Sequence, residues 1–118
     1  MANENNVVNL DYLNSMSGGN KDIIREMIGL FQQQVPEFLS EMKELHKNGD
    51  WHNLGALAHK AKSSIAIMGM EMLADKLKEL EVKAKKGEDP DSYQSYIRLF
   101  EDQTTIAVSE LDQILKTL

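Results

Sequence analysis

Apolar side chains recur along most of this chain at alternating spacings of three and four residues, the period of one face of an α-helix. The longest stripe predicts a helix that begins after Asn20, a good N-terminal cap, and ends at Asn48-Gly49. Pro36 lies inside it; because the stripe keeps its phase, we expect a bend between Gln32 and Pro36 and not a break. The stripe consists of Ile24, Ile28, Phe31, Val35, Phe38, Met42 and Leu45.

Three more segments share this period, and each is bounded by residues that start or stop helices. Asp50 is the expected cap of the next helix, Gly87 the expected end of the one after, and Asp89-Pro90 the expected start of the last. A shorter pattern predicts a helix between Asn9 and Gly18-Gly19. The apolar positions are Leu54, Ala58, Ala61, Ile65 and Met68; Met70, Leu73, Leu77, Leu80 and Ala84; Tyr93, Ile97, Phe100, Thr104, Ala107, Leu111, Ile114 and Leu118; and, in the short helix, Leu10, Leu13 and Met16.

None of these segments has the alternating period of a β-strand. Short connections between consecutive helices make neighbours antiparallel. We therefore expect an all-α fold, an antiparallel up-down-up-down four-helix bundle with an additional short N-terminal helix, in which residues 1–118 form a single domain. Residues 1–8 are expected to fray.

The composition excludes several classes of protein. The chain has no cysteine, which rules out disulfides, thiolate catalysis and cysteine-based metal sites. Its net charge of −6 disfavours binding to nucleic acid, because the phosphate backbone is also negatively charged. The first residues lack the basic and apolar regions of a signal peptide, and no apolar run approaches the roughly 18 residues of a membrane span. We expect a cytoplasmic protein that binds neither nucleic acid nor membrane.

One histidine has an unusual setting. On a helical wheel His59 lies roughly 150° from the middle of the apolar stripe of its helix, so its imidazole should face water. Gly55, Lys62, Ser63 and Ala66 share that outer face. Glycine inside a helix lowers its stability by roughly 0.5–1 kcal/mol relative to alanine. The presence of Gly55 therefore needs an explanation, and close approach of another molecule to the helix backbone is one. An ordinary solvated surface histidine is the alternative reading.

The sequence lacks the motifs of metal centres, nucleotide-binding sites and common catalytic sites. Di-metal centres in helix bundles need Glu-x-x-His pairs, whereas Lys43, Gly49 and Ala56 stand three residues before the three histidines. We therefore expect no metal site. A glycine-rich phosphate loop, a nucleophile elbow and a kinase signature are all absent from the sequence, so nothing in it would bind ATP.

The run of residues 58–69 resembles the signature of histidine-containing phosphotransfer (HPt) domains. There the active histidine is followed by an apolar residue two positions on, a lysine three positions on, a glycine with small residues, and a second glycine ten positions on. Ala61 is smaller than the usual apolar residue, and Ser63 replaces the first glycine. The likeness extends to residues 49–51 and 11–19 and covers nearly the whole chain. The matching positions are His59, Lys62, Ser64 and Gly69.

By this resemblance the chain would be a phosphoryl carrier and not an enzyme with kinase activity of its own. It would pass the group between aspartates of receiver domains, which belong to response regulators and hybrid histidine kinases. His59 would accept the group through Nε2, although the sequence alone does not choose the nitrogen, and Lys62 would stabilise it. The receiver would supply magnesium, and the chain would need no cofactor. One exposed reactive face suggests a monomer.

Further residues are candidates for contact with the phosphoryl group or for docking of the partner. Gln34 matches a position that in some HPt domains supplies a side chain near the histidine. Ser63 narrows the approach to His59 and could hydrogen-bond the imidazole or the phosphoryl group. The full set is Ser63, Gly55, Ala66, Lys60, Gln34 and His52.

Two other functions stay open from the sequence. The same bundle could dock a receiver or a kinase without carrying phosphate, although the presence of His59 together with Lys62 argues against this. A hydrolase would need a second catalytic group near His59, and the sequence shows none.

Overall fold

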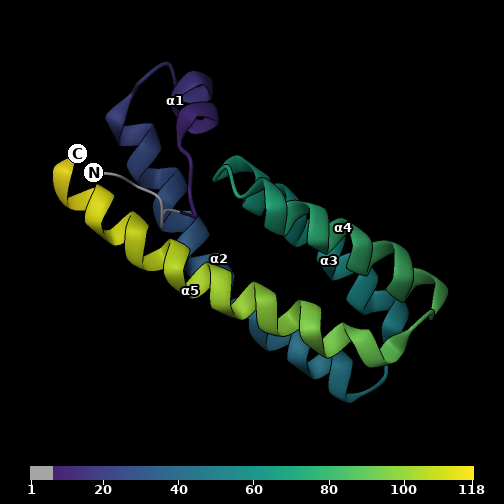
Figure 1. Ribbon diagram of the computed structural model, residues 1–118. Coiled ribbons are helices and arrows are strands. Elements are labelled where there is room, and N and C mark those ends of the chain that lie inside the picture. The colour runs from purple at the N-terminus through teal and green to yellow at the C-terminus, as the bar shows by residue number, and fades with distance from the viewer. Residues whose placement is uncertain (1–6) are drawn as a thin grey trace.

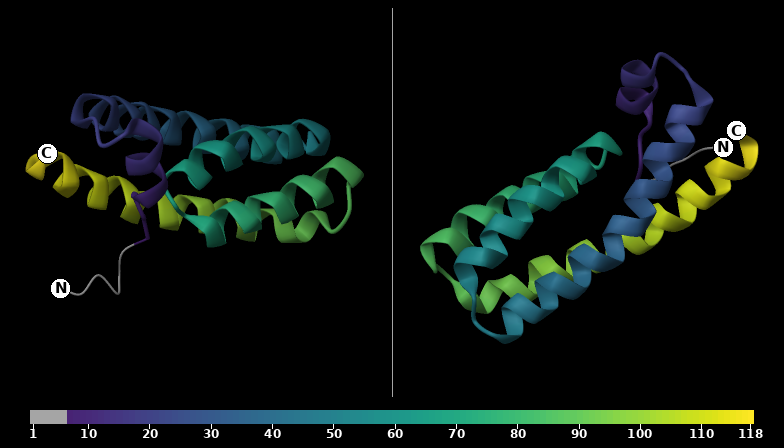
Figure 2. Two further views of the ribbon diagram at one scale, coloured as in Figure 1. Left: turned by 90° about the horizontal axis from the view of Figure 1, so that it is seen from above. Right: turned by 180° about the vertical axis from the view of Figure 1, so that it is seen from behind.

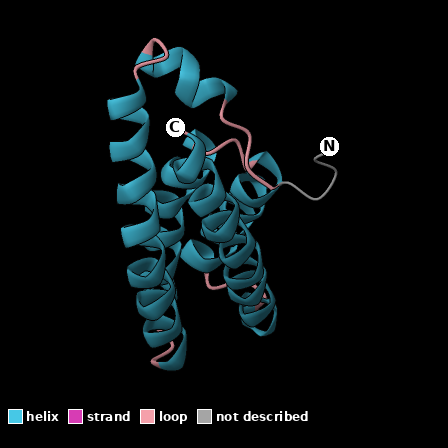
Figure 3. Ribbon diagram, turned by 90° about the vertical axis from the view of Figure 1, so that its left-hand side faces the viewer, coloured by secondary structure: helices cyan, strands magenta, loops and turns pink. Residues whose placement is uncertain are grey.

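The computed structural model describes residues 7–118, and within that range every regular element is a helix (Figure 3). The all-α prediction is confirmed for this part of the chain. In chain order the elements are α1 (Asp11–Ser17), α2 (Lys21–Lys47), α3 (Trp51–Ile67), α4 (Glu71–Lys86), the short 3-10 helix η1 (Pro90–Ser92) and α5 (Tyr93–Thr117).

The two longest helices, α2 and α5, lie side by side, and α3 lies beside α4 (Figures 1 and 2). Within the described residues, α3 and α4 are the pair of helices whose backbones approach most closely along their length. Because α3 and α4 are shorter than the other pair, one end of α2 and α5 extends past them, and α1 lies near that end (Figure 1).

Two of the helices begin at residues whose side chains cap the first turn. Asn20 accepts hydrogen bonds from the amides of Asp22 (2.9 Å) and Ile23 (3.2 Å) and so caps α2. Asp50 caps α3 through the amide of Asn53. The α2 helix runs through Pro36 without a break, as predicted.

The predicted stripes form the core. Every predicted position in α3 and α4 is buried, and the stripes of α2 and α5 are buried except toward their C-terminal ends, where Leu45, Ile114 and Leu118 are half-buried. In the short helix, Leu13 is fully buried, whereas Met16 is exposed. Apolar burial on this scale is the main force that holds the helices together.

The N-terminal segment departs from the prediction that residues 1–8 fray. The amides of Val7 and Val8 donate to the carboxylate of Glu110 on α5 (2.9–3.1 Å), and Val8 is buried, so the prediction is wrong for these two residues. Residues 1–6 lie outside the described range. Two satisfied amides and a buried valine supply a reason for this segment to stay ordered.

The same segment also joins the turn between α3 and α4. The amide of Asn9 donates to the carbonyl of Met68 (2.9 Å), and Gly69, with φ of 73°, packs directly against the Asn9 backbone. A methyl group at Gly69 would lie 2.7 Å from Asn9 Cβ. Gly69 thus serves both a left-handed turn and a close approach between two chain segments.

The start of the last helix differs from the expected capping pair. Asp89 has a φ of 54°, in the left-handed region, and its side chain makes no capping hydrogen bond. Pro90 instead begins a 3-10 turn, and α5 starts at Tyr93. The buried Tyr93 hydroxyl donates to the carbonyls of Lys83 (3.0 Å) and Glu88, which fixes this connection.

Candidate functional site

His59 lies on the solvent-facing side of α3, as the helical wheel predicts. Its side chain is 61% exposed, while the neighbouring Ala58 and Ala61 are buried in the core. The backbone of α3 is fixed by that buried stripe, so the imidazole projects from a rigid support and remains open to a partner.

One edge of the imidazole is occupied by a carboxylate of the neighbouring helix. His59 Nδ1 lies 3.0 Å from Oε2 of Glu81 on α4. An ionised carboxylate can only accept a hydrogen bond, so the tautomer with its proton on Nδ1 is the one that suits this contact. In a neutral ring the lone pair then resides on Nε2, which lies on the opposite side of the imidazole from Nδ1.

Two lysines complete a cluster around this carboxylate. Lys85 Nζ lies 3.1 Å from the same oxygen, Oε2, and Lys62 Nζ lies 3.6 Å from Oε1. The Glu81 residue is only 8% exposed, and among residues 7–118 its Oε1 has no hydrogen-bond partner, only the ammonium of Lys62 beyond it. The cluster is a buried negative charge held between cations and an imidazole.

The protonation of Glu81 follows from these contacts. Burial opposes ionisation of the carboxyl, but the hydrogen bonds from Lys85 and His59 and the charges nearby outweigh it, so the pKa of Glu81 lies below its ordinary value. Glu81 is therefore a carboxylate near neutral pH and acts as an acceptor toward His59.

Gly55 explains how α4 comes so close. A methyl group at Gly55 would lie 2.9 Å from Lys85 Cγ and 3.0 Å from the carbonyl oxygen of Glu81. Gly55 is buried, so the prediction that it lies on the outer face is wrong. The close approach it permits is that of α4, not of another molecule, and it brings Glu81 and Lys85 to the edge of α3.

A comparison with protein families matches the Hpt domain model over residues 26–117. The chain belongs to the Hpt domain family. No curated protein and no solved structure matches it. Hpt domains carry phosphoryl groups on histidine in phosphorelays and interact with receiver domains. The matched range contains His59, Lys62 and Glu81, whereas α1 and the N-terminal segment precede it.

Gln34, the candidate taken from other Hpt domains, is engaged elsewhere. Its Oε1 accepts a hydrogen bond from the hydroxyl of Ser64 (3.0 Å), which joins α2 to α3. Among residues 7–118 no hydrogen bond or ion pair links Gln34 to His59. Within the described residues, Gln34 therefore supports the helix that carries the histidine and makes no polar contact with the imidazole.

The remaining predicted residues lie at the surface of α3. Ser63, Ala66, Lys60 and His52 are all exposed. By the resemblance described above, Ser63 replaces a glycine, and its hydroxyl makes no hydrogen bond to another side chain within the described residues. Lys60 and His52 are likewise accessible to a docking partner, on the helix that bears His59.

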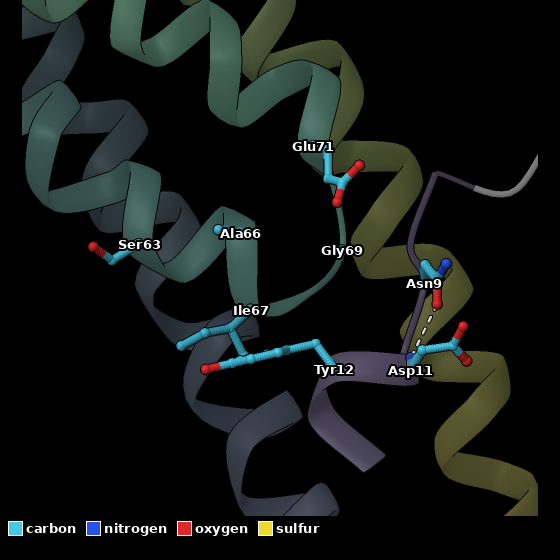
Figure 4. Close-up of a pocket in the computed structure, with 8 residues that line it drawn as sticks. All are labelled: Asn9, Asp11, Tyr12, Ser63, Ala66, Ile67, Gly69 and Glu71. Atoms are coloured by element: carbon cyan, nitrogen blue, oxygen red, sulfur yellow. Dashed lines mark hydrogen bonds between the residues drawn. The ribbon is translucent and has the colours of Figure 1, made fainter. Parts of the chain in front are cut away.

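A groove of about 720 Å³ opens beside this surface (Figure 4). Ser63 and Ala66 line it from α3, and Tyr12 reaches it from α1 with its ring lying along Ile67. Tyr12 is 58% exposed, which is high for a large aromatic residue. Ser63 stands one turn beyond His59 on α3, so the groove lies close to the exposed histidine along the helix.

Glu81 is the main residue of the candidate site that could not be recognised from the sequence motif. A signal was present, because Glu81 stands four residues after Leu77 and three before Ala84, inside the apolar stripe of α4. A carboxylate in a buried stripe requires a partner. Lys85, the second cation, is exposed and lies outside that stripe, so the same signal does not indicate it.

The structure shows neither a metal cluster nor a membrane span in its described part. Over residues 7–118, no group of three or more histidine, aspartate or glutamate side chains is arranged to hold a metal ion. None of the helices there is long and apolar enough to cross a bilayer.

Proposed function

We propose that this Hpt domain accepts a phosphoryl group on His59 from the aspartyl phosphate of one receiver domain and passes it to another. The observation that carries the proposal is the arrangement of the imidazole: Nδ1 is held at 3.0 Å by the buried Glu81, and the ring is exposed. This arrangement supports Nε2 as the reacting atom.

The chemical step balances without a further reactant. The lone pair of Nε2 attacks phosphorus, a nitrogen–phosphorus bond forms, and the phosphorus–oxygen bond to the partner's aspartate breaks, so that the electron pair leaves on the aspartyl carboxylate. The ring becomes positively charged while it still carries the Nδ1 proton. The negative charge of Glu81 stabilises this positive charge. Because Nδ1 keeps its proton, the ring can leave as neutral imidazole in the onward transfer.

Lys62 is proposed to stabilise the phosphoryl oxygens, one turn along α3 from His59. At rest its ammonium lies 3.6 Å from Glu81 Oε1, so it must turn outward when a phosphoryl group arrives. A hydrogen bond to a charged group is worth about 1.5–3 kcal/mol, or roughly 10- to 150-fold in rate when it is made in the transition state. Lys62→Ala should slow transfer by this factor without abolishing it.

The proposal also includes the arrangement of the helices, the location and oligomeric state of the protein, and its need for cofactors. We take residues 1–118 as one domain, with α2 to α5 as an antiparallel up-down-up-down four-helix bundle and α1 added to it, a view supported by the short connections and by the pairing of the helices. The protein would act as a cytoplasmic monomer. Magnesium would come from the receiver, and the chain would hold neither cofactor nor nucleotide.

The test is transfer of radiolabel from phosphorylated receiver domains to the purified protein. Wild type should become labelled with the stability of a phosphoramidate, labile in acid and stable in base. His59→Ala should take up no label. His46→Ala is the control, because His46 is a histidine of α2 outside the candidate site, and it should be labelled like wild type.

Equal labelling of wild type and His59→Ala would remove the proposal. Binding of receivers without any labelling would instead favour a docking module that carries no phosphate.

A further inference from the structure

Charge is distributed very unevenly over this acidic protein. Residues 51–86, which comprise α3, α4 and their connecting turn, carry seven lysines against four acidic residues, a net charge of +3. The rest of the chain carries six basic and fifteen acidic residues, a net charge of −9. The two helices that build the His59 site are therefore cationic, and the remainder is strongly anionic.

Part of this positive charge is free for a partner. Lys62 and Lys85 are paired with the buried Glu81, but Lys60 and Lys78 are exposed and form no ion pair within residues 7–118. Lys60 directly follows His59 on α3. Lys78 stands three residues before Glu81, so it shares the face of α4 that carries the cluster.

The chemistry of the partner complements this charge. A phosphorylated aspartate carries close to two negative charges, and a magnesium ion that contacts phosphate is usually held by further carboxylates. The surface around such a site is therefore acidic. The rest of the chain, with its net charge of −9, would repel such a surface, and the cationic pair α3 and α4 would attract it.

We propose that the exposed lysines of α3 and α4, Lys60 and Lys78 foremost, form an interaction surface that guides the acidic rim of a phosphorylated aspartate site onto His59. This inference rests on the proposed function and adds to it the means by which the partner is oriented. Oriented charge of this kind raises association rates by about 10- to 1000-fold and loses its effect as salt screens it.

The experiment measures the second-order rate of label transfer to His59 from a receiver domain charged with acetyl phosphate. The receiver is the one of a panel that labels wild type fastest. The variant is Lys60→Glu with Lys78→Glu, which leaves both lysines that contact Glu81 unchanged. The control is Lys21→Glu with Lys116→Glu, the same change of net charge on exposed residues of α2 and α5.

At an ionic strength of about 20 mM the first variant should transfer about tenfold more slowly than wild type, and the control should stay within about twofold. At about 0.5 M salt, where the screening length is only a few ångströms, the difference should shrink to less than about twofold. A milder variant, Lys60→Gln with Lys78→Gln, should show about half the effect on a logarithmic scale, which covers the case of a glutamate variant that folds poorly.

Equal slowing in the variant and its control, or a wild-type rate that does not change with salt, would overturn the surface while leaving the phosphoryl transfer intact. Failure of the proposed function has a different signature, namely that wild type takes up no label at any salt concentration.

Discussion

His59 Nδ1 and Glu81 Oε2 lie 3.0 Å apart across the interface between α3 and α4. The carboxylate belongs to the core, the imidazole to the surface, and this close contact joins them. Under the proposed function, this contact leaves Nε2 as the nitrogen available to a receiver, and it makes the rate of transfer depend on the packing of two helices.

The contribution of this contact can be measured with two substitutions. Glu81→Gln keeps an oxygen that can accept from Nδ1 but removes the charge, and we expect roughly a fivefold slower transfer to His59. Glu81→Leu keeps the apolar packing and removes the acceptor, and we expect a loss of about 10- to 150-fold. Single-turnover transfer from a phosphorylated receiver gives both rates.

Glu79→Gln is the control, because Glu79 is an exposed residue of the same helix. A folded Glu81→Leu protein that transfers as fast as wild type would show that the carboxylate does not position the ring.

The lowered pKa of Glu81 predicts how stability depends on pH. Between the lowered value and the ordinary value of 4.5, the unfolded chain binds more protons at this residue than the folded protein does. The stabilisation is therefore complete above pH 4.5 and is lost as the pH falls through the pKa of the folded state. Urea titrations of wild type and Glu81→Gln between pH 7 and pH 3 should show wild type more stable at pH 7 and the gap closing below pH 4.5.

If the difference in free energy of unfolding between wild type and Glu81→Gln stayed constant from pH 7 to pH 3, Glu81 would not be an ionised residue that stabilises the fold.

Gly55 and Gly29 form a matched pair of helical glycines. At Gly55 a methyl group would press on Lys85 and on the Glu81 backbone, whereas at Gly29 it would meet nothing within 4 Å. Gly29→Ala should stabilise the protein by about 0.5–1 kcal/mol through helix propensity. Gly55→Ala should destabilise it by about 1–3 kcal/mol, because the two helices must separate.

The midpoint of urea unfolding measures both effects. Gly55→Ala should also slow transfer to His59, since it displaces Glu81. Equal stability changes in the two variants would contradict the close approach of α4.

Gly69 and Gly18 form a second pair, because both have positive φ, at 73° and 64°. Gly18→Ala should cost about 1–2 kcal/mol from backbone strain alone, since nothing lies near it. Gly69→Ala should cost more, because its methyl group would also displace Asn9. Thermal or urea unfolding of the two variants isolates the contact with Asn9, and equal losses would show that this contact contributes little.

The sequence predicts the core far better than it predicts the contacts between helices. Leu77 and Ala84 could be assigned to a buried stripe because helical periodicity is a local property. The position of Glu81 against His59 depends on the rotation and spacing of two helices, which arise only when they pack. Gly55 illustrates the difference, because a wheel drawn for one helix cannot show that a second helix covers it.

The long-range contacts of the N-terminal segment also could not be predicted from local sequence patterns. Glu110 lies more than one hundred residues from Val7, and nothing in the sequence near either residue indicates the pair. The polar start of the chain indicated fraying, whereas two backbone amides find a carboxylate on α5. By contrast, the outward orientation of His59 followed from its place on one helix and was predicted correctly.

The contacts of Asn9 and Leu13 have a practical consequence for the choice of fragments. The family match begins at residue 26, so a protein trimmed to that boundary would lack both residues. It would expose the apolar surface that Leu13 covers, leave the Met68 carbonyl without its partner and remove the Tyr12 side of the groove. The folded unit of this protein is therefore longer than the range that the family model matches.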